Sequence, residues 1–118
     1  MEKEIIKKAQ ALEALAALGQ ETRLDVFRLL VKAGDAGLAA GEIAARLDVR
    51  ANTLSSHLSI LQRAGLIRQA REGRSLRYRA DYAGMLGLLS YLLEDCCGGR
   101  PEICAPLGSL CIPANPSC

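Results

Sequence analysis

The sequence predicts a mainly helical α+β domain, and two observations support this prediction. Through most of residues 5–64, apolar residues recur at three- and four-residue spacing, which is the period of an amphipathic helix. Between residues 66 and 79 the pattern changes to alternation, which is the period of a strand. At 118 residues, 50% of them hydrophobic, the chain is long enough for one domain with a single buried core.

Four helices are expected before the alternating segment. The first covers residues 5–18 and the second residues 21–33, and each is followed by a glycine that favours a helix end. A short third helix is expected over residues 41–47, with Ile43, Ala44 and Leu47 facing inward.

The fourth helix is expected over residues 51–64 and ends at Gly65. Leu54, Leu58 and Leu61 share one of its faces because they are spaced at i, i+4 and i+7. The other face is polar.

A β-hairpin and a fifth helix follow. The alternating segments 66–71 and 75–79 are joined by the turn Glu72-Gly73-Arg74. Asp81 is expected to cap a fifth helix that ends at Asp95. All four prolines lie beyond residue 100, so we expect irregular chain from Gly98 onward. The chain therefore divides into a folded domain, residues 1–95, and a tail rich in Cys, Pro and Gly, residues 96–118.

Charge is concentrated in the segment from Glu42 to Arg79. It holds eight arginines, no lysine and three acidic residues, whereas the whole chain has a net charge of only +2. Because the guanidinium group contacts phosphate bidentately, this usage indicates a surface for a polyanion. A solvated charged face is the alternative. Two short helices followed directly by a basic hairpin predict a winged helix-turn-helix with a two-stranded wing.

The sequence resembles the ArsR/SmtB family of bacterial metalloregulators over roughly residues 10–95. The resemblance rests on a combination of four motifs. They are Glu42-Ile43-Ala44, the string Thr53-Leu54-Ser55-Ser56-His57-Leu58 continuing to Leu61, the segment Ala64-Gly65-Leu66-Ile67, and Gly73-Arg74 with Tyr78 in the wing.

The resemblance implies that the helix over residues 51–64 enters the major groove of operator DNA. Small hydroxyl and amide side chains on this helix can reach base edges, and arginines of the wing can contact the DNA backbone or minor groove. The candidate DNA-binding residues are Asn52, Thr53, Ser55, Ser56, Ser59, Arg63, Arg71, Arg74 and Arg77. Side chains of this kind on an exposed helix are also often merely solvated.

The resemblance also implies a homodimer formed by the first and fifth helices. The apolar run from Met85 to Leu93 fits such an interface, although it would also fit an ordinary core. A two-fold dimer would need a palindromic operator. His57, the one histidine of the chain, is expected to have a structural role on the packed side of the fourth helix.

All five cysteines lie in the last 23 residues, at Cys96, Cys97, Cys104, Cys111 and Cys118. Adjacent α-carbons are about 3.8 Å apart, so a disulfide between Cys96 and Cys97 would be strained. In a reducing compartment, clustered thiols indicate metal binding or redox chemistry before a disulfide framework.

The cysteine cluster resembles that of arsenic-responsive ArsR repressors with a Cys-Cys pair after the last helix and a third cysteine further on. The resemblance implies a site made of Cys96, Cys97 and Cys104 for trivalent arsenic, either arsenite or an organoarsenical, as inducer. Three thiolates suit a soft trigonal species. Zinc, cadmium or lead stays open, and so does a thiol redox switch. We expect no structural cofactor, although a structural metal is a further alternative.

Other function classes have little support in the sequence. We see no catalytic Ser/His/Asp set, phosphate-binding glycine loop or Cys-x-x-Cys motif, so we expect a regulator and not an enzyme. The sequence shows neither a secretory signal nor an apolar run long enough to span a membrane. We therefore expect a cytoplasmic protein without a membrane partner.

Overall fold

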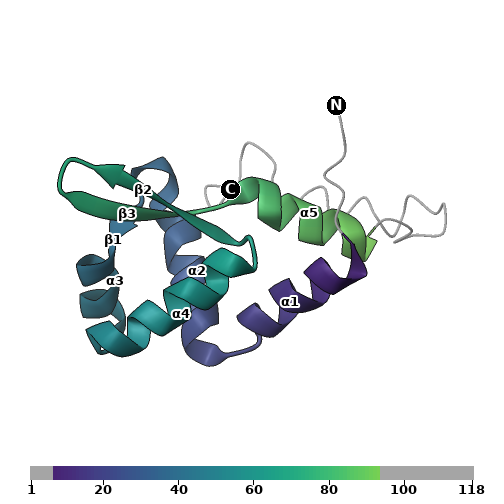
Figure 1. Ribbon diagram of the computed structural model, residues 1–118, viewed down its shortest axis with the longest axis horizontal. Helices are drawn as coiled ribbons and strands as arrows, with labels where there is room; N and C mark the ends of the chain where they lie inside the picture. Colours follow the sequence, from purple (N-terminus) through teal and green to yellow (C-terminus); the bar gives the residue numbers. More distant parts are fainter. Residues whose placement is uncertain (1–6, 94–118) are drawn as a thin grey trace.

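The computed structural model describes residues 7–93, which form five α-helices, a short 3-10 helix and three strands (Figure 1). In chain order these are α1 (Lys8–Leu18), α2 (Glu21–Ala33), η1 (Gly34–Ala36), β1 (Leu38–Ala39), α3 (Ala40–Leu47), α4 (Ala51–Arg63), β2 (Ile67–Glu72), β3 (Ser75–Ala80) and α5 (Tyr82–Leu93). Every predicted helix and both predicted strands are present. The prediction of a mainly helical winged helix-turn-helix is confirmed.

One hydrophobic core joins α2, α3, α4 and the start of β2. The predicted inner face of α4 is confirmed, because Leu54, Leu58 and Leu61 are at most 3% exposed. Leu30 of α2 and Ile43 of α3 are fully buried against the same core. Among residues 7–93, no polar or charged side chain is buried, so the burial of apolar surface stabilises this assembly.

The sheet has three strands, whereas the sequence predicted two. Its order is β1-β3-β2 and both pairings are antiparallel, with Leu38 opposite Tyr78 and Ala39 opposite Arg77. Strand β1 could not be predicted from the sequence, because two residues are too few to show an alternating pattern. Gly37 allows β1 to lie close to β3, because its φ is +64° and a Cβ atom there would lie 2.6 Å from the carbonyl oxygen of Tyr78.

Helix α1 packs through small side chains. Its buried residues are Ala11, Ala14 and Ala17, whereas Leu12 and Leu15 are 57% and 42% exposed. The alanines let the α1 backbone approach the core closely, and this orientation turns the leucines outward. The hydrophobic leucine stripe of α1 is therefore available to another surface.

Helix α5 begins as predicted, because the Asp81 carboxylate accepts a hydrogen bond from the backbone N–H of Gly84 (3.2 Å). Much of its apolar run is exposed: Leu86, Leu89, Leu92 and Leu93 are 39–49% exposed. An ordinary core therefore does not account for the run. The predicted end at Asp95 and the irregular chain after Gly98 lie outside the described residues. No helix among residues 7–93 has the length and apolar character needed to cross a membrane.

Arg23 connects three helices. Its Nε–H donates to the carbonyl oxygen of Ala17 at the end of α1 (2.7 Å), and its Nη1 lies 3.4 Å from Nδ1 of His57 on α4. Partial burial, with the nearby Arg23 charge as a smaller cause, lowers the pKa of His57 below its ordinary value of 6.5. His57 is thus a partly buried packing residue, in keeping with its predicted structural role.

The lowered pKa of His57, which is due mainly to its partial burial, predicts a pH dependence of stability. The unfolded chain binds a proton at His57 more readily than the folded chain. The contribution of neutral His57 to the free energy of unfolding is therefore complete above pH 6.5 and is lost as pH falls through the lowered pKa. Between pH 7.5 and 5.5 the free energy of unfolding should fall more steeply for the wild type than for His57→Gln, as measured by urea denaturation. Equal slopes for the two proteins would contradict the assignment.

Candidate nucleic-acid interface

The outward face of α4 carries a continuous polar stripe. Asn52, Ser56, Ser59 and Arg63 follow one another at helical spacing and are all exposed, opposite the buried leucines. Thr53 and Ser55 are also exposed and flank this stripe. The predicted helix residues therefore share one accessible side, and Asn52 additionally accepts a hydrogen bond from the N–H of Thr53 (2.9 Å) through Oδ1.

A tight turn joins α3 to α4. Asp48 ends α3 in the left-handed conformation, with φ +55° and ψ +52°, and Val49 donates its N–H to the carbonyl oxygen of Ala44 (3.0 Å). At the other end of α3, Glu42 accepts a hydrogen bond from the N–H of Ala39 (2.8 Å). This carboxylate caps the helix. The two helices are thus held as a helix-turn-helix unit.

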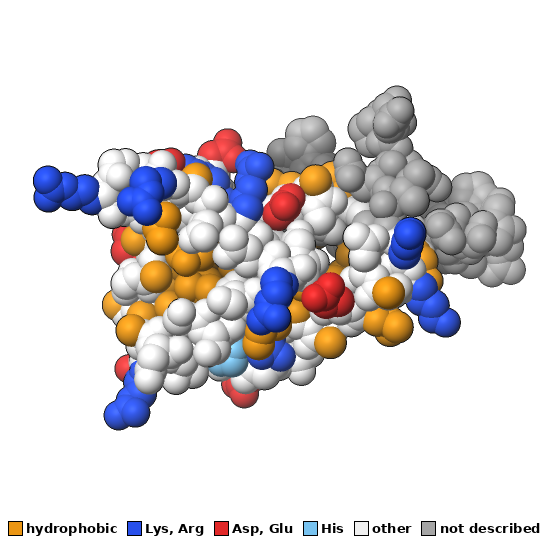
Figure 2. Space-filling model, viewed as in Figure 1, with side chains coloured by type: hydrophobic (Ala, Val, Ile, Leu, Met, Phe, Trp, Pro, Cys, Tyr) orange, Lys and Arg blue, Asp and Glu red, His pale blue; other side chains and the backbone are white. Residues whose placement is uncertain are grey.

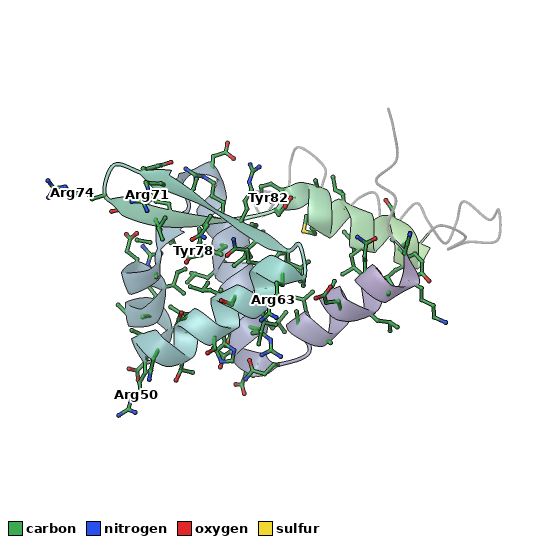
Figure 3. All side chains as sticks on the ribbon, viewed as in Figure 1. Arg50, Arg63, Arg71, Arg74, Tyr78 and Tyr82 are labelled. Atoms are coloured by element: carbon green, nitrogen blue, oxygen red, sulfur yellow. The ribbon has the colours of Figure 1, made fainter. Side chains whose placement is uncertain are left out.

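The wing is the hairpin of β2 and β3, which pairs from Ile67 opposite Ala80 to Glu72 opposite Ser75. Gly73 in the connecting turn has φ +64°, a conformation that suits glycine. Arg71 and Arg74 are exposed, and Figure 3 shows Arg74 extending away from the end of the hairpin. These two predicted arginines are therefore accessible to a polyanion.

Arg77, the third predicted arginine of the wing, is held by the protein itself. Its guanidinium donates to the carbonyl oxygens of Ala36 and Gly37, both at 3.0 Å, and approaches the Glu42 carboxylate at 3.4 Å. These contacts fasten β3 to the segment before α3. A DNA contact by Arg77 would have to compete with them.

Arg79 is held in a similar way. It donates to the carbonyl oxygen of Asp35 (2.6 Å) and forms an ion pair with Glu72 across the hairpin. The hydrogen bond that Arg79 donates to the Glu72 carboxylate is the main reason why the pKa of Glu72 is lowered, and the charges of Arg79 and Arg77 act in the same direction. Glu72 therefore remains ionised and offsets part of the positive charge of the wing.

The structure adds Arg50, which the predicted set of binding residues left out. Arg50 is the N-cap residue of α4 and is exposed. Its side chain projects from the end of the molecule that also carries the wing tip and Arg74 (Figure 3). Blue side chains mark both corners of this end in the space-filling view (Figure 2). The position of Arg50 immediately before a helix was the available sequence signal, since a helix N-terminus favours phosphate.

The predicted thiol site lies outside the described residues, because Cys96, Cys97 and Cys104 all follow Leu93. Within residues 7–93 there is no group of three or more His, Cys, Asp or Glu side chains that could hold a metal ion. The described part of the chain thus contains the candidate DNA surface, and the effector site remains a prediction.

Comparison with known proteins identifies the same architecture. A family described as a helix-turn-helix domain matches residues 18–70, a span that contains α2, α3, α4 and the start of the wing. The transcriptional activator HlyU of Vibrio cholerae is 35% identical over 84 residues, which cover 71% of this chain and 75% of HlyU.

Two further proteins are similar to this chain. The "Putative arsenical resistance operon repressor ArsR" of Halobacterium salinarum is 37% identical over 78 residues, covering 63% of this chain and 60% of that protein. A homodimeric winged helix-turn-helix DNA-binding domain of a possible ArsR-family regulator from Mycobacterium bovis superposes with a TM-score of 0.58 at 26% identity, covering 78% of this chain and 85% of that domain. The chain belongs to the ArsR/SmtB family of transcriptional regulators, which bind DNA through a helix-turn-helix domain.

Proposed function

We propose that this protein is a homodimeric repressor that binds a palindromic operator and is released by trivalent arsenic bound to Cys96, Cys97 and Cys104. The DNA-binding part of this proposal rests on the exposed polar stripe of α4, combined with the exposed Arg50 and Arg74, which project from one end of the molecule. The thiol cluster of the sequence carries the effector part.

The α4 stripe is suited to the major groove, which is wide enough to admit one helix. Asn52 can use its amide to bond base edges, while the hydroxyls of Ser56 and Ser59 can donate or accept. Arg50, Arg71 and Arg74 would contact phosphates and thereby orient α4 in the groove. In this arrangement the helix side chains read sequence, and the arginines supply most of the salt-dependent affinity.

The exposed leucines of α1 and α5 support a dimer. Leu12 and Leu15 on α1, together with Leu86 and Leu89 on α5, leave apolar surface uncovered on two helices that contact each other. Hydrophobic side chains are visible on the surface beside both helices in Figure 2. A second copy related by two-fold symmetry would cover both stripes and place two α4 helices about 34–36 Å apart, or a multiple of that distance.

The arsenic part rests on ligand chemistry. Cys96 and Cys97 follow Leu93 closely in sequence, and Cys104 comes after a Gly-Gly pair that allows the chain to turn back. Three thiolates without nitrogen or oxygen partners favour a soft, trigonal species over zinc, which prefers four ligands in structural sites. The arsenical-resistance name of the Halobacterium relative points in the same direction.

Release of DNA would follow from coupling between the thiol site and α5. Binding of arsenic after the end of α5 would favour a dimer geometry in which the two α4 helices no longer fit successive grooves. A coupling free energy of about 1–3 kcal/mol is typical of such regulation and would weaken DNA binding roughly 5- to 150-fold.

The first prediction of this proposal concerns phosphate contacts. Arg50→Ala and Arg74→Ala should each weaken binding to an operator selected from a random duplex pool. Each should also lower the salt slope of dimer binding by about two, because one phosphate contact is lost in each of the two subunits. Fluorescence anisotropy at several salt concentrations measures both quantities. Lys8→Ala on α1 removes a positive charge away from this surface and should leave the slope unchanged. An unchanged slope in both arginine variants would argue against the proposed surface.

The second prediction concerns the dimer. Leu89→Glu places a carboxylate in the proposed interface, where its burial in the dimer is costly, so sedimentation should show a monomer at micromolar concentration. Leu76→Glu is a matched control, since Leu76 is 40% exposed and Leu89 is 43% exposed but Leu76 lies on the wing. A dimeric Leu89→Glu protein would contradict an α5 interface.

The third prediction concerns the inducer. Arsenite should release the operator from fully reduced protein, and Cys96→Ser and Cys104→Ser should each abolish release while leaving DNA affinity intact, because two thiolates hold arsenite poorly. Cys118→Ser should behave as the wild type. Fluorescence anisotropy follows the release.

Other outcomes identify the alternatives. Release by phenylarsenite alone, surviving Cys104→Ser, would indicate an organoarsenical sensor with a two-thiol site. Insensitivity to arsenicals with release by cadmium, lead or peroxide would replace arsenic with another soft metal or with a thiol redox switch. Unfolding by a chelator would instead indicate a structural metal.

A further inference from the structure

The first turn of α5 rests on the turn that ends α4, and the contact is made by backbone. A Cβ atom built on Gly84 would overlap the carbonyl oxygen of Gly65 and lie 2.9 Å from its carbonyl carbon. Both clashing atoms belong to the main chain, so no side-chain rotation could relieve the overlap. Only glycine at position 84 permits this approach.

Hydrogen bonds hold both sides of the contact in place. Gly65, with φ +80°, donates its N–H to the carbonyl oxygen of Gln62 (3.0 Å), and Leu66 donates to the carbonyl oxygen of Leu61 (3.1 Å). These bonds close the C-terminal end of α4. The backbone N–H of Asp81 donates to the carbonyl oxygen of Leu66 (2.8 Å), and the Asp81 carboxylate accepts a hydrogen bond from the N–H of Gly84. The end of α4 and the start of α5 are therefore joined by a short backbone clamp.

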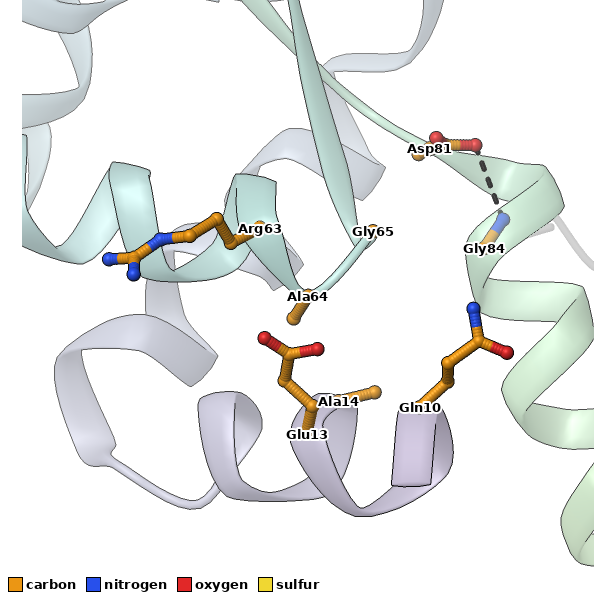
Figure 4. A pocket seen from close by; sticks show the side chains of 8 residues that line it. All are labelled: Gln10, Glu13, Ala14, Arg63, Ala64, Gly65, Asp81 and Gly84. Atoms are coloured by element: carbon orange, nitrogen blue, oxygen red, sulfur yellow. Dashed lines mark hydrogen bonds between the residues drawn. The ribbon is translucent and has the colours of Figure 1, made fainter. Parts of the chain in front are cut away.

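Side chains fill the neighbourhood of this clamp incompletely. A pocket of about 280 Å³ opens between α1, the end of α4 and the start of α5 (Figure 4). It is lined by Gln10, Glu13, Ala14, Arg63, Ala64, Gly65, Asp81 and Gly84. The angle between α4 and α5 is therefore set by this backbone contact together with α1, which contacts both helices.

We propose that Gly84 is a positioning residue that sets the operator half-site spacing to which the dimer binds. This inference rests on the proposed dimeric DNA binding, in which α5 contacts the second subunit and α4 enters the groove. The Gly84–Gly65 contact is then the joint between the dimer interface and the DNA-reading helix. Its geometry determines how far apart the two α4 helices lie.

Because α4 is long, a small rotation at the Gly84–Gly65 contact moves the far end of α4 by a large distance. Its 13 residues span about 20 Å at a rise of 1.5 Å per residue. A rotation of about 10° at the α5 joint would therefore move the distant N-terminal end of α4 by about 3.5 Å, which matches the rise of one base pair, about 3.4 Å. A methyl group at position 84 forces the first turn of α5 away from Gly65 and should change the spacing by this order.

The test uses Gly84→Ala in the full chain. Wild-type protein first selects an operator from a random duplex pool, and duplexes are then prepared with the same half-sites moved apart or together by one and two base pairs. Gly84→Ala should bind the selected spacing at least 10-fold more weakly and should show a shifted or flattened spacing optimum. Its affinity for a single half-site should remain that of the wild type, because the α4 surface is unaltered.

Gly41→Ala is the matched control, because it adds the same methyl group to a helix where nothing lies within 4 Å. It should keep the wild-type spacing profile. A Gly84→Ala protein that is less stable but has the wild-type profile would overturn the inference and leave Gly84 a purely structural residue.

If Gly84→Ala fails to fold by circular dichroism, Asp81→Ala is the second variant. It removes the side-chain cap of Gly84 while leaving the backbone bond to Leu66, and its spacing profile should broaden. An unaltered profile in that variant also overturns the inference. Failure of the wild type to select a two-half-site operator would instead refute the proposed dimeric function, so the two failures are distinguishable.

Discussion

The burial of three leucines on one side of α4 is the constraint on which the rest of the structure depends. Leu54, Leu58 and Leu61 are almost completely removed from solvent, so rotation of α4 about its axis would expose apolar surface at a cost of several kcal/mol. The outward stripe from Asn52 to Arg63 is a direct consequence of this burial. The α3–α4 turn and the wing then place charged groups around an already oriented helix.

Arginine has two different uses in this protein, and the contacts separate them. Arg77 and Arg79 donate to backbone carbonyls and pair with Glu42 and Glu72, which ties the wing to the segment before α3. Arg50 and Arg74, in contrast, project from the surface at one end of the molecule. The density of arginine in the sequence therefore overstates the charge that is free to meet DNA.

Regular elements were largely predictable from the sequence, because helical spacing and alternation report burial on one face. The limits of prediction have physical causes. Strand β1 is too short to show a period, and the bonds of Arg77 depend on a tertiary contact between positions about 40 residues apart. The packing of α1 through alanines reverses the simple rule that the largest apolar residues face the core. For the thiol site, the residue types and spacing remain the argument, since these cysteines lie outside residues 7–93.

The pairing order of the sheet has a further consequence. Strand β3 pairs with a neighbouring strand along each of its edges, whereas the outer edge of β2 has no neighbouring strand among residues 7–93. An open strand edge can recruit an identical edge from another molecule and start aggregation. After Ile67, every residue of β2 is exposed, and three of the five are charged, namely Arg68, Arg71 and Glu72. These charges therefore keep neighbouring copies from joining their sheets, and the two arginines among them also suit the wing to nucleic acid.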